Sequence, residues 1–337
     1  MVVTRKYVVK KYFQGVPKLS DYEVVEEELP PLKDGEILVK AEWISVDPYL
    51  WINNSNRQLP YDQFSFQVGV VKESKDPKYP VGSRVVTHRG WCTYSIINMS
   101  IIPTGRSDKQ YALPDLKGLP LSLAVGAIGM PGVSAYLAFM EIGKPKPGDT
   151  VVVSGAAGAI GTIVGQLAKI KGCRVIGFAG TDRKVAWLEK ELGFDKAYNY
   201  KTTDIAKVLS EAAPGGVDIY YDNVGGELSS TVMYQMNNGG RVVIVGSISS
   251  YSSLKLDELP KVTVLQPAIV FKSLKVEGFI VWDWFSRWHE AFEDIIKLIK
   301  SGQLKAPEHV TEGFDNLFDA FIGMLHGENF GKAVVKV

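Results

Sequence analysis

The residues most informative for chemistry are three glycines between a strand-like run and a helix-like run. Gly155, Gly158 and Gly161 follow the apolar run 151–153 with the spacing G-x-x-G-x-x-G, and a helical pattern then continues to Lys171. Glycines let a backbone turn tightly and approach a pyrophosphate, whose charge is stabilised by the free N–H groups and dipole of a helix N-terminus. Close packing alone also favours such a turn. Because a strand precedes it and a helix follows, the segment predicts a dinucleotide site.

The end of the next strand-like run indicates which dinucleotide would bind. NAD sites place an acidic side chain there, about 20 residues on, to hold the ribose 2′-hydroxyl. This run ends on Ala179 and Gly180, and the basic residues Arg183 and Lys184 follow. Small residues leave room for a 2′-phosphate that a basic side chain would neutralise, so NADPH is predicted rather than NADH. Asp182 could contact the ribose as in an NAD site, but it is interpreted as the cap of a helix that starts at Arg183. The two basic residues could instead form a solvated helix face.

A parallel sheet is needed to position these residues, and the second half of the chain has its pattern. Strand-like runs alternate there with helix-like runs, as in repeated βαβ units. Six runs match a doubly wound (Rossmann) sheet, at 151–155, 173–180, 196–200, 217–225, 240–247 and 274–281. Earlier residues are β-rich. We therefore expect an α/β protein with a dinucleotide-binding domain over 126–301 and a β-rich catalytic domain over 1–125, completed by 302–337.

Composition excludes several classes of protein. The 337 residues are 46% apolar and 22% charged, which is typical of a globular protein. The 38 basic and 37 acidic side chains nearly cancel, so we expect neither a nucleic acid nor a membrane as partner. Two cysteines, Cys92 and Cys173, exclude a disulfide scaffold and favour a cytoplasmic protein. The four histidines lack the spacing of metal ligands, and no metal site is predicted.

Six motifs, taken as a set, resemble a known family. They are GMPGVSAY (129–136), AAGAIG (156–161), NYKT (199–202), YDNVGG (221–226), GSISSY (246–251) and NFGK (329–332). The set is similar to zinc-independent medium-chain dehydrogenases/reductases, in the branch of the prostaglandin reductases (leukotriene hydroxydehydrogenases) and plant alkenal double-bond reductases. The resemblance covers the whole chain. It implies an NADP-dependent reductase in which a Rossmann domain accompanies a GroES-like catalytic domain.

The resemblance also implies which residues would hold the cofactor. Lys184 and Tyr200 would hold the 2′-phosphate. Asn223 would line the nicotinamide ribose, and Asn329 would close the site from the tail. The full implied set is Met130, Gly158, Ala159, Ile160, Gly161, Lys184, Tyr200, Asn223, Val245, Gly246, Ser247, Ile248, Ser249, Ser250, Tyr251, Phe279, Ile280, Val281 and Asn329. The chain departs from the family's pattern at Leu50-Trp51, where Met-Arg is usual, and at 252–257, where a proline-rich loop is usual.

Two tyrosines are candidates for the chemistry of reduction. Without a metal to polarise a carbonyl, an alkene conjugated to a carbonyl is easier to reduce than an isolated ketone. Hydride goes to the β-carbon and negative charge moves to the carbonyl oxygen as an enolate, to which the protein donates hydrogen bonds. Tyr251 follows the C-terminal end of a strand, where open α/β folds place ligands, and Tyr49 follows a turn-forming Asp-Pro. We predict both as catalytic, with enals, enones and 15-oxo-prostaglandin-like lipids as substrates.

Two other functions stay open on the sequence alone. A quinone reductase of the same superfamily would use the same cofactor with a flatter pocket. A non-catalytic NADPH-binding structural protein would bind the nucleotide without oxidising it. In each case residues 274–281 form the last strand of the sheet, and because an unpaired edge invites pairing with a second copy, we expect a homodimer joined there.

Overall fold

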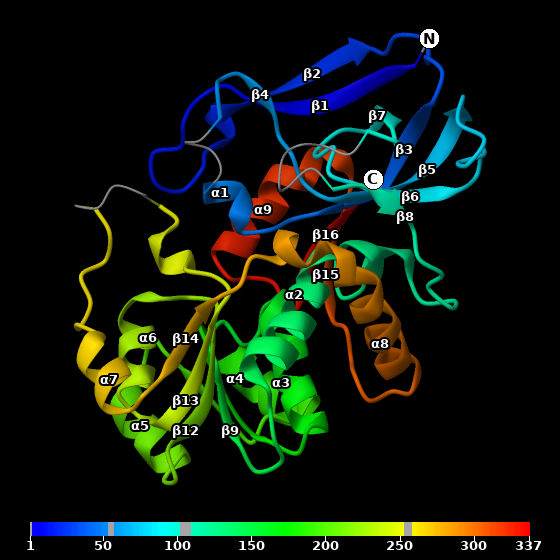
Figure 1. Cartoon of the computed structure of the whole chain (residues 1–337). Coiled ribbons are helices and arrows are strands. Elements are labelled where there is room, and N and C mark those ends of the chain that lie inside the picture. The colour runs from blue at the N-terminus through cyan, green and yellow to red at the C-terminus, as the bar shows by residue number, and fades with distance from the viewer. Residues whose placement is uncertain (1, 53–56, 102–108, 253–257) are drawn as a thin grey trace. The chain divides into compact units, whose positions relative to one another are not determined.

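The backbone falls into two compact units (Figure 1). The computed structural model describes residues 2–52, 57–101, 109–252 and 258–337. Unit 1 comprises Met1–Gly129, His309–Asn329 and Ala333–Val337, and unit 2 comprises Met130–Glu308 and Phe330–Lys332. The sequence predicts domains over 1–125 with 302–337 and over 126–301. These limits concern parts that fold independently, so they stay a prediction beside the two compact units.

Unit 2 contains a parallel sheet whose described strands number six, in the order β11-β10-β9-β12-β13-β14. The strands are β9 (Thr150–Val153), β10 (Arg174–Ala179), β11 (Lys196–Asn199), β12 (Val217–Asp222), β13 (Met236–Ile244) and β14 (Lys275–Gly278). The first strand of the unit is central and the order reverses beside it, which defines a doubly wound sheet. The predicted fold class is confirmed.

Helices cover both faces of this sheet because neighbouring strand residues point in opposite directions. Tyr220 belongs to a buried cluster with residues of α5, α6 and α7, whereas the Tyr221 hydroxyl donates to the carbonyl of Ser134 in α2. The helices of unit 2 are α2 (Met130–Ala138), the π-helical η4 (Phe139–Gly143), α3 (Ala159–Ile170), α4 (Asp182–Leu192), α5 (Ile205–Ala212), α6 (Gly226–Met233), η5 (Ile248–Ser250), α7 (Gln266–Phe271), η6 (Val281–Arg287) and α8 (Trp288–Lys300).

Unit 1 is β-rich. Antiparallel pairing joins β2-β1-β4 in one sheet, and a second sheet has the order β15-β16-β3-β5-β6-β8, with β7 antiparallel on β3. Ser45 of β3 pairs with Val334 of β16, so the tail completes the larger sheet. The strands are β1 (Val3–Val9), β2 (Tyr22–Glu28), β3 (Glu36–Ser45), β4 (Tyr61–Asp62), β5 (Gln67–Ser74), β6 (Arg84–Thr87), β7 (Tyr94–Asn98), β8 (Tyr111–Ala112), β15 (Glu308–Glu312) and β16 (Lys332–Lys336).

Aromatic side chains fill much of the core of unit 1. The Trp91 ring stacks on Tyr22 with centroids 5.9 Å apart and meets Tyr7 and Phe321 edge to face. Such pairs bury large apolar areas in defined geometry. The helices of this unit are η1 (Leu19–Asp21), α1 (Tyr49–Ile52), η3 (Leu121–Val125), η7 (Phe314–Asn316) and α9 (Leu317–Leu325).

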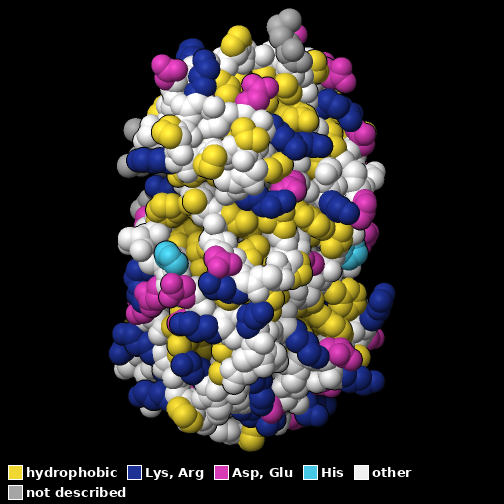
Figure 2. Space-filling view, turned by 90° about the vertical axis from the view of Figure 1, so that its right-hand side faces the viewer, with side chains coloured by type: hydrophobic (Ala, Val, Ile, Leu, Met, Phe, Trp, Pro, Cys, Tyr) yellow, Lys and Arg dark blue, Asp and Glu magenta, His cyan; other side chains and the backbone are white. Residues whose placement is uncertain are grey.

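The surface carries charges of both signs. Figure 2 shows Lys and Arg side chains interspersed with Asp and Glu over the visible face, in keeping with a net charge of +1. Over the described ranges, the helices are all too short or too polar to cross a bilayer.

Candidate active site

The glycine-rich segment forms a turn from β9 into α3. Gly155 has a φ of +59°, and a Cβ on Gly161 would lie 2.4 Å from the Gly155 carbonyl oxygen, so this position tolerates only glycine. A Cβ on Gly158 would meet nothing closer than 3.4 Å. Gly158 caps α3 without a side-chain hydrogen bond. The first N–H groups of this helix, at residues 159–161, therefore form an anion-binding end.

The start of α4 differs from the sequence-based interpretation in one respect. Thr181, not Asp182, is the N-cap, because the Thr181 hydroxyl accepts a hydrogen bond from the Lys184 N–H at 3.3 Å. The Asp182 carboxylate instead accepts a hydrogen bond of 2.7 Å from the Asn199 amide. The cap prediction for Asp182 is wrong by one residue, since a threonine hydroxyl satisfies the same N–H one position earlier.

Basic side chains gather where β10 ends and α4 begins. Lys184 is only 7% exposed, and burial together with the charge of Lys201 lowers its pKa. The Tyr200 hydroxyl lies beside Gly180, at 3.4 Å from where a Cβ would stand. A buried cation that faces a second cation is stabilised by an anion, and a 2′-phosphate supplies two negative charges and several acceptor oxygens. These residues therefore fit the group that the sequence predicts.

One buried residue, Asp222, uses its carboxylate and its main-chain carbonyl to hold the loops that follow β12 and β13. Oδ1 of Asp222 accepts hydroxyl hydrogen bonds from Ser154 at 2.9 Å and Tyr220 at 2.8 Å, and backbone N–H bonds from Val224 and Gly225 at 2.9 Å each. The main-chain carbonyl of Asp222 accepts the N–H groups of residues 245 and 246. Asp222 thus links the carboxyl ends of three neighbouring strands.

Asn223 and the 245–251 segment are held at this same edge. The Asn223 amide donates to the Ser154 carbonyl at 2.8 Å, and its backbone N–H donates to the Ser154 hydroxyl at 2.9 Å. The hydroxyl of Ser249 donates to the Val224 carbonyl at 2.6 Å. The structure therefore brings the predicted residues of this segment beside Asn223, at the edge where doubly wound sheets bind ligands.

Tyr251 folds back over the turn that precedes it. Its hydroxyl accepts the N–H of Ser247 at 3.3 Å, and burial raises the pKa of the phenol. The phenol therefore keeps its proton at neutral pH, and that proton remains available to a second acceptor. From residue 253 onward, the departure from the family's pattern at 252–257 lies outside the described residues.

The residues after β14 have several of their backbone groups already engaged. The Phe279 N–H donates to the Ile244 carbonyl at 2.8 Å, which attaches this segment to the end of β13. The carbonyls of Ile280 and Val281 accept from Asp283 and from the Trp288 indole, respectively. Phe279 is buried and Ile280 is half exposed. In residues 279–281, the backbone groups outside these hydrogen bonds and the Ile280 side chain are therefore the ones that can contact a ligand.

Three predicted residues lie near or beyond the limits of unit 2. Met130 begins α2, and its carbonyl accepts the Ser134 hydroxyl at 2.8 Å. Asn329 and Tyr49 belong to unit 1. Asn329 is buried, and the residue that follows it already belongs to unit 2.

Tyr49 has a partner that the sequence did not reveal. Its hydroxyl lies 3.0 Å from Nε2 of His88, and the two rings stack with centroids 6.1 Å apart. His88 is buried, with Phe66 edge to face against it at 4.8 Å. Burial and the charge of Asp47 raise the pKa of Tyr49 well above its usual value. The only hint in the sequence is that His88 directly follows a buried valine-rich run.

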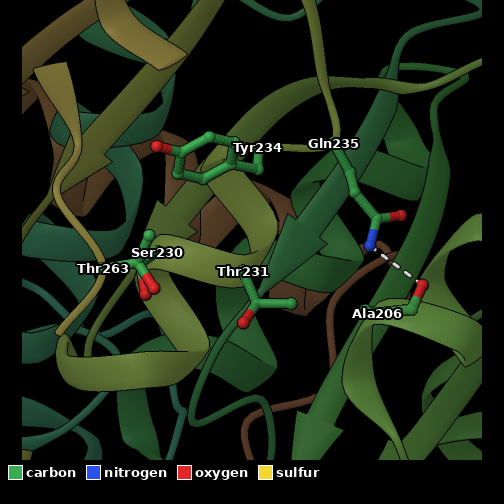
Figure 3. Close-up of a pocket in the computed structure, with 6 residues that line it drawn as sticks. All are labelled: Ala206, Ser230, Thr231, Tyr234, Gln235 and Thr263. Carbon is green, nitrogen blue, oxygen red and sulfur yellow. Dashed lines mark hydrogen bonds between the residues drawn. The ribbon is translucent and has the colours of Figure 1, made fainter. Parts of the chain in front are cut away.

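A shallow pocket of about 260 Å³ lies elsewhere on unit 2 (Figure 3). Its lining consists of Ala206, Ser230, Thr231, Tyr234, Gln235 and Thr263. The Gln235 amide donates to the Ala206 carbonyl at 2.9 Å, and the Gln235 carbonyl accepts the N–H of Val217, which begins β12. The pocket therefore lies toward the amino ends of the strands and contains none of the predicted residues. Among the residues that the structure describes, no three His, Cys, Asp or Glu side chains converge as a metal site would require.

Comparison with known proteins assigns the chain to a family. A model of the family described as "Zinc-binding dehydrogenase" matches residues 159–301, and one described as "N-terminal domain of oxidoreductase" matches 5–102. Prostaglandin reductase 1 of Bos taurus is 46% identical over 100% of both chains. The 2-alkenal reductase (NADP(+)-dependent) of Nicotiana tabacum is 36% identical over 100% of this chain and 98% of its own.

A solved structure agrees with these relatives. CurA from Vibrio vulnificus in complex with NADPH is 34% identical, with a TM-score of 0.89 over 99% of each chain. Similarity of this extent, over whole chains, establishes common membership. The chain belongs to the zinc-independent medium-chain dehydrogenases/reductases, in the family of prostaglandin reductase 1 and the NADP-dependent 2-alkenal reductases.

Proposed function

We propose that this chain reduces the carbon–carbon double bond of α,β-unsaturated aldehydes and ketones with NADPH. It is an NADP-dependent oxidoreductase that acts on double bonds, as are its relatives named as prostaglandin and 2-alkenal reductases. The observation that carries the proposal is the Tyr251 phenol, which receives the Ser247 N–H and keeps its own proton. Such a group can donate a hydrogen bond to an enolate oxygen.

The cofactor residues divide into four groups, according to the part of NADPH that each would contact. The N-terminus of α3, at residues 158–161, would bind the pyrophosphate, and Lys184 with Tyr200 would bind the 2′-phosphate. Asn223 and residues 245–251 would line the nicotinamide ribose, since Asp222 holds both loops in place. Phe279, Ile280 and Val281 would adjoin the nicotinamide, Met130 would border it, and Asn329 would close the site. When bound, NADPH supplies the hydride that the β-carbon of the substrate accepts.

The two tyrosines would act on the substrate oxygen and α-carbon. Tyr251 stabilises the developing enolate by hydrogen bonding, and Tyr49, oriented by His88, is the second hydroxyl. The raised pKa of both phenols keeps them as donors through the neutral range. Proton delivery to the α-carbon completes the reduction.

The test is NADPH consumption across 2-alkenals, enones, a 15-oxo-prostaglandin and quinones. We expect turnover with the enals and enones and a 15-oxo-prostaglandin, with the saturated carbonyl as product. Faster turnover of quinones than of every enal would favour a quinone reductase. Nucleotide binding without oxidation by any member of the panel would favour a non-catalytic protein.

The quaternary structure and cellular location belong to the same proposal. We infer a homodimer formed through β14, because this edge strand is exposed along its length and lies beside apolar side chains. Phe271 is 83% exposed and Ile280 is 50% exposed. Gel filtration of the wild type should give twice the monomer mass. Val276→Asp in β14 should reduce the apparent mass to that of a monomer, whereas the control Val81→Asp in unit 1 should leave the dimer mass unchanged. Both cysteines are free, which supports a cytoplasmic location. The similarity to prostaglandin reductase 1 supports a role in lipid metabolism.

A further inference from the structure

Three residues of the tail are built into the nucleotide-binding unit. The Gly331 N–H donates to the Ala157 carbonyl at 2.9 Å, and Gly331 forms a parallel bridge with Gly158 of the phosphate loop. The Lys332 N–H donates to the Pro307 carbonyl at 3.0 Å. Gly331 has a φ of +68°, and a Cβ there would lie 2.1 Å from the Pro307 oxygen. The backbone at this point is therefore fixed against the turn that begins α3, and Phe330 is fixed with it.

The ring of Phe330 lies among the first residues of α4. The guanidinium carbon of Arg183 stands 4.9 Å from its centroid, and Nζ of Lys184 stands 5.6 Å from it. Trp187 meets the ring edge to face, with centroids 5.1 Å apart and planes at 87°. One aromatic side chain thus contacts both cations that the sequence places beside the 2′-phosphate.

An aromatic ring stabilises a cation near its face through its quadrupole. For Lys184, which is buried near Lys201, such stabilisation offsets part of what burial costs. The ring also limits the directions in which two long, flexible side chains can extend, so less conformational entropy is lost when an anion binds. The Trp187 contact holds the ring itself in one orientation.

We propose that Phe330 is a positioning residue that sets the preference for NADPH over NADH, by holding Arg183 and Lys184 where the 2′-phosphate binds. The inference rests on the proposed function, because it assumes that NADPH is the nucleotide. Phe330 lies against the first residues of α4 and is not among the residues proposed to adjoin the nicotinamide. Its effect is confined to the end of the nucleotide that distinguishes NADPH from NADH.

The experiment is calorimetric titration of the full chain with NADPH, NADH, adenosine 2′,5′-bisphosphate and 5′-AMP. Phe330→Leu removes the ring and keeps an apolar side chain, and we expect its Kd for NADPH and the bisphosphate to rise about tenfold. The Kd for NADH and 5′-AMP should stay within about twofold. Phe330→Tyr, which retains an aromatic face, should bind like the wild type, and Phe330→Met replaces Phe330→Leu if the latter does not fold.

Two results would contradict the role of Phe330. They are an unchanged NADPH affinity in the Leu and Met variants, and an equal loss for NADPH and NADH, which is what a purely structural role predicts. Failure of the wild-type chain to bind NADPH would instead overturn the proposed function. The bisphosphate and 5′-AMP report on the adenosine end alone, so these outcomes are distinguishable without measuring catalysis.

Discussion

The hydroxyl of Tyr49 and Nε2 of His88 lie 3.0 Å apart, and aromatic side chains of unit 1 pack around both rings. Phe64 stacks on Tyr49 at 6.1 Å, and Phe66 closes the other side of the imidazole. These contacts restrict the rotation of both rings, so the hydroxyl has one preferred direction. His88 therefore influences the proposed reaction through the orientation of the Tyr49 hydroxyl.

Loss of this partner should reduce turnover modestly. We expect His88→Leu to lower kcat for a 2-alkenal by about three- to tenfold, the value of one neutral hydrogen bond. His88→Gln, whose amide can reach the same hydroxyl, should recover most of the rate. In the double variant with Tyr49→Phe, the two losses should not add, because both remove the same interaction. Fully additive losses would show that His88 acts independently of Tyr49.

Tyr251→Phe should separate catalysis from cofactor binding. Removal of a hydrogen-bond donor to the enolate should lower kcat by about 10²-fold. NADPH affinity should change little, since the variant keeps the aromatic ring and loses the hydroxyl, which accepts the Ser247 N–H. Steady-state kinetics and nucleotide titration measure the two quantities. Full activity in this variant would move the stabilising role to the cofactor ribose or to water.

Lys184→Met should weaken NADPH far more than NADH. A charge-assisted bond to a phosphate contributes about 1.5–3 kcal/mol, so the Kd for NADPH should rise about ten- to hundredfold. The methionine retains most of the apolar stem, which limits any loss of packing. Equal losses for the two nucleotides would contradict the assignment of the 2′-phosphate site.

The same variant should be more stable than the wild type when no nucleotide is present. Burial, and then the charge of Lys201, lowers the pKa of Lys184 in the folded chain. Between this pKa and the unfolded value of about 10.4, the unfolded chain binds more protons, so stability rises with pH there. The charged lysine destabilises the fold fully at lower pH. Lys184→Met should therefore have a higher Tm at pH 7, and the difference should shrink as the pH rises toward about 10.4, above which lysine is neutral in both states. A lower Tm at pH 7 would contradict the argument.

Asp222→Asn should cost both stability and nucleotide affinity. Four donors converge on Oδ1 of Asp222, and loss of its charge should lower the free energy of unfolding by about 1–3 kcal/mol. NADPH affinity should fall as well, because the Asp222 carboxylate holds the backbone of Val224 and Gly225, directly after Asn223. A matched control is Asp218→Asn in the same strand, where the carboxylate accepts from Thr150 and Asn237 at the opposite end. Denaturation should detect a loss in both variants, and NADPH titration only in Asp222→Asn.

Local patterns predicted the sheet and the glycine-rich turn between β9 and α3 well. The glycine spacing and the alternation of strands and helices are properties of short segments, and both appear in unit 2 as expected. One boundary was displaced. The N-cap of α4 is Thr181 rather than Asp182, because the Thr181 hydroxyl accepts the Lys184 N–H.

The partners of the site residues could not be predicted, because they are distant in sequence. Tyr49 and His88 are separated by 39 positions in the sequence, and Phe330, which contacts Lys184, belongs to the last segment of the chain in unit 2. Nothing in the types of these residues specifies the pairing. Only the three-dimensional fold brings them together.

The pairing of Ser45 with Val334 has a consequence for how the molecule assembles. Closure of so long a loop is entropically unfavourable, and contacts of high sequence separation form slowly. Nearly all residues of unit 2 come from one uninterrupted stretch of the chain, so unit 2 can fold before β16 pairs with β3. Docking of β16 onto β3 should therefore be the late event in refolding, after the doubly wound sheet already exists.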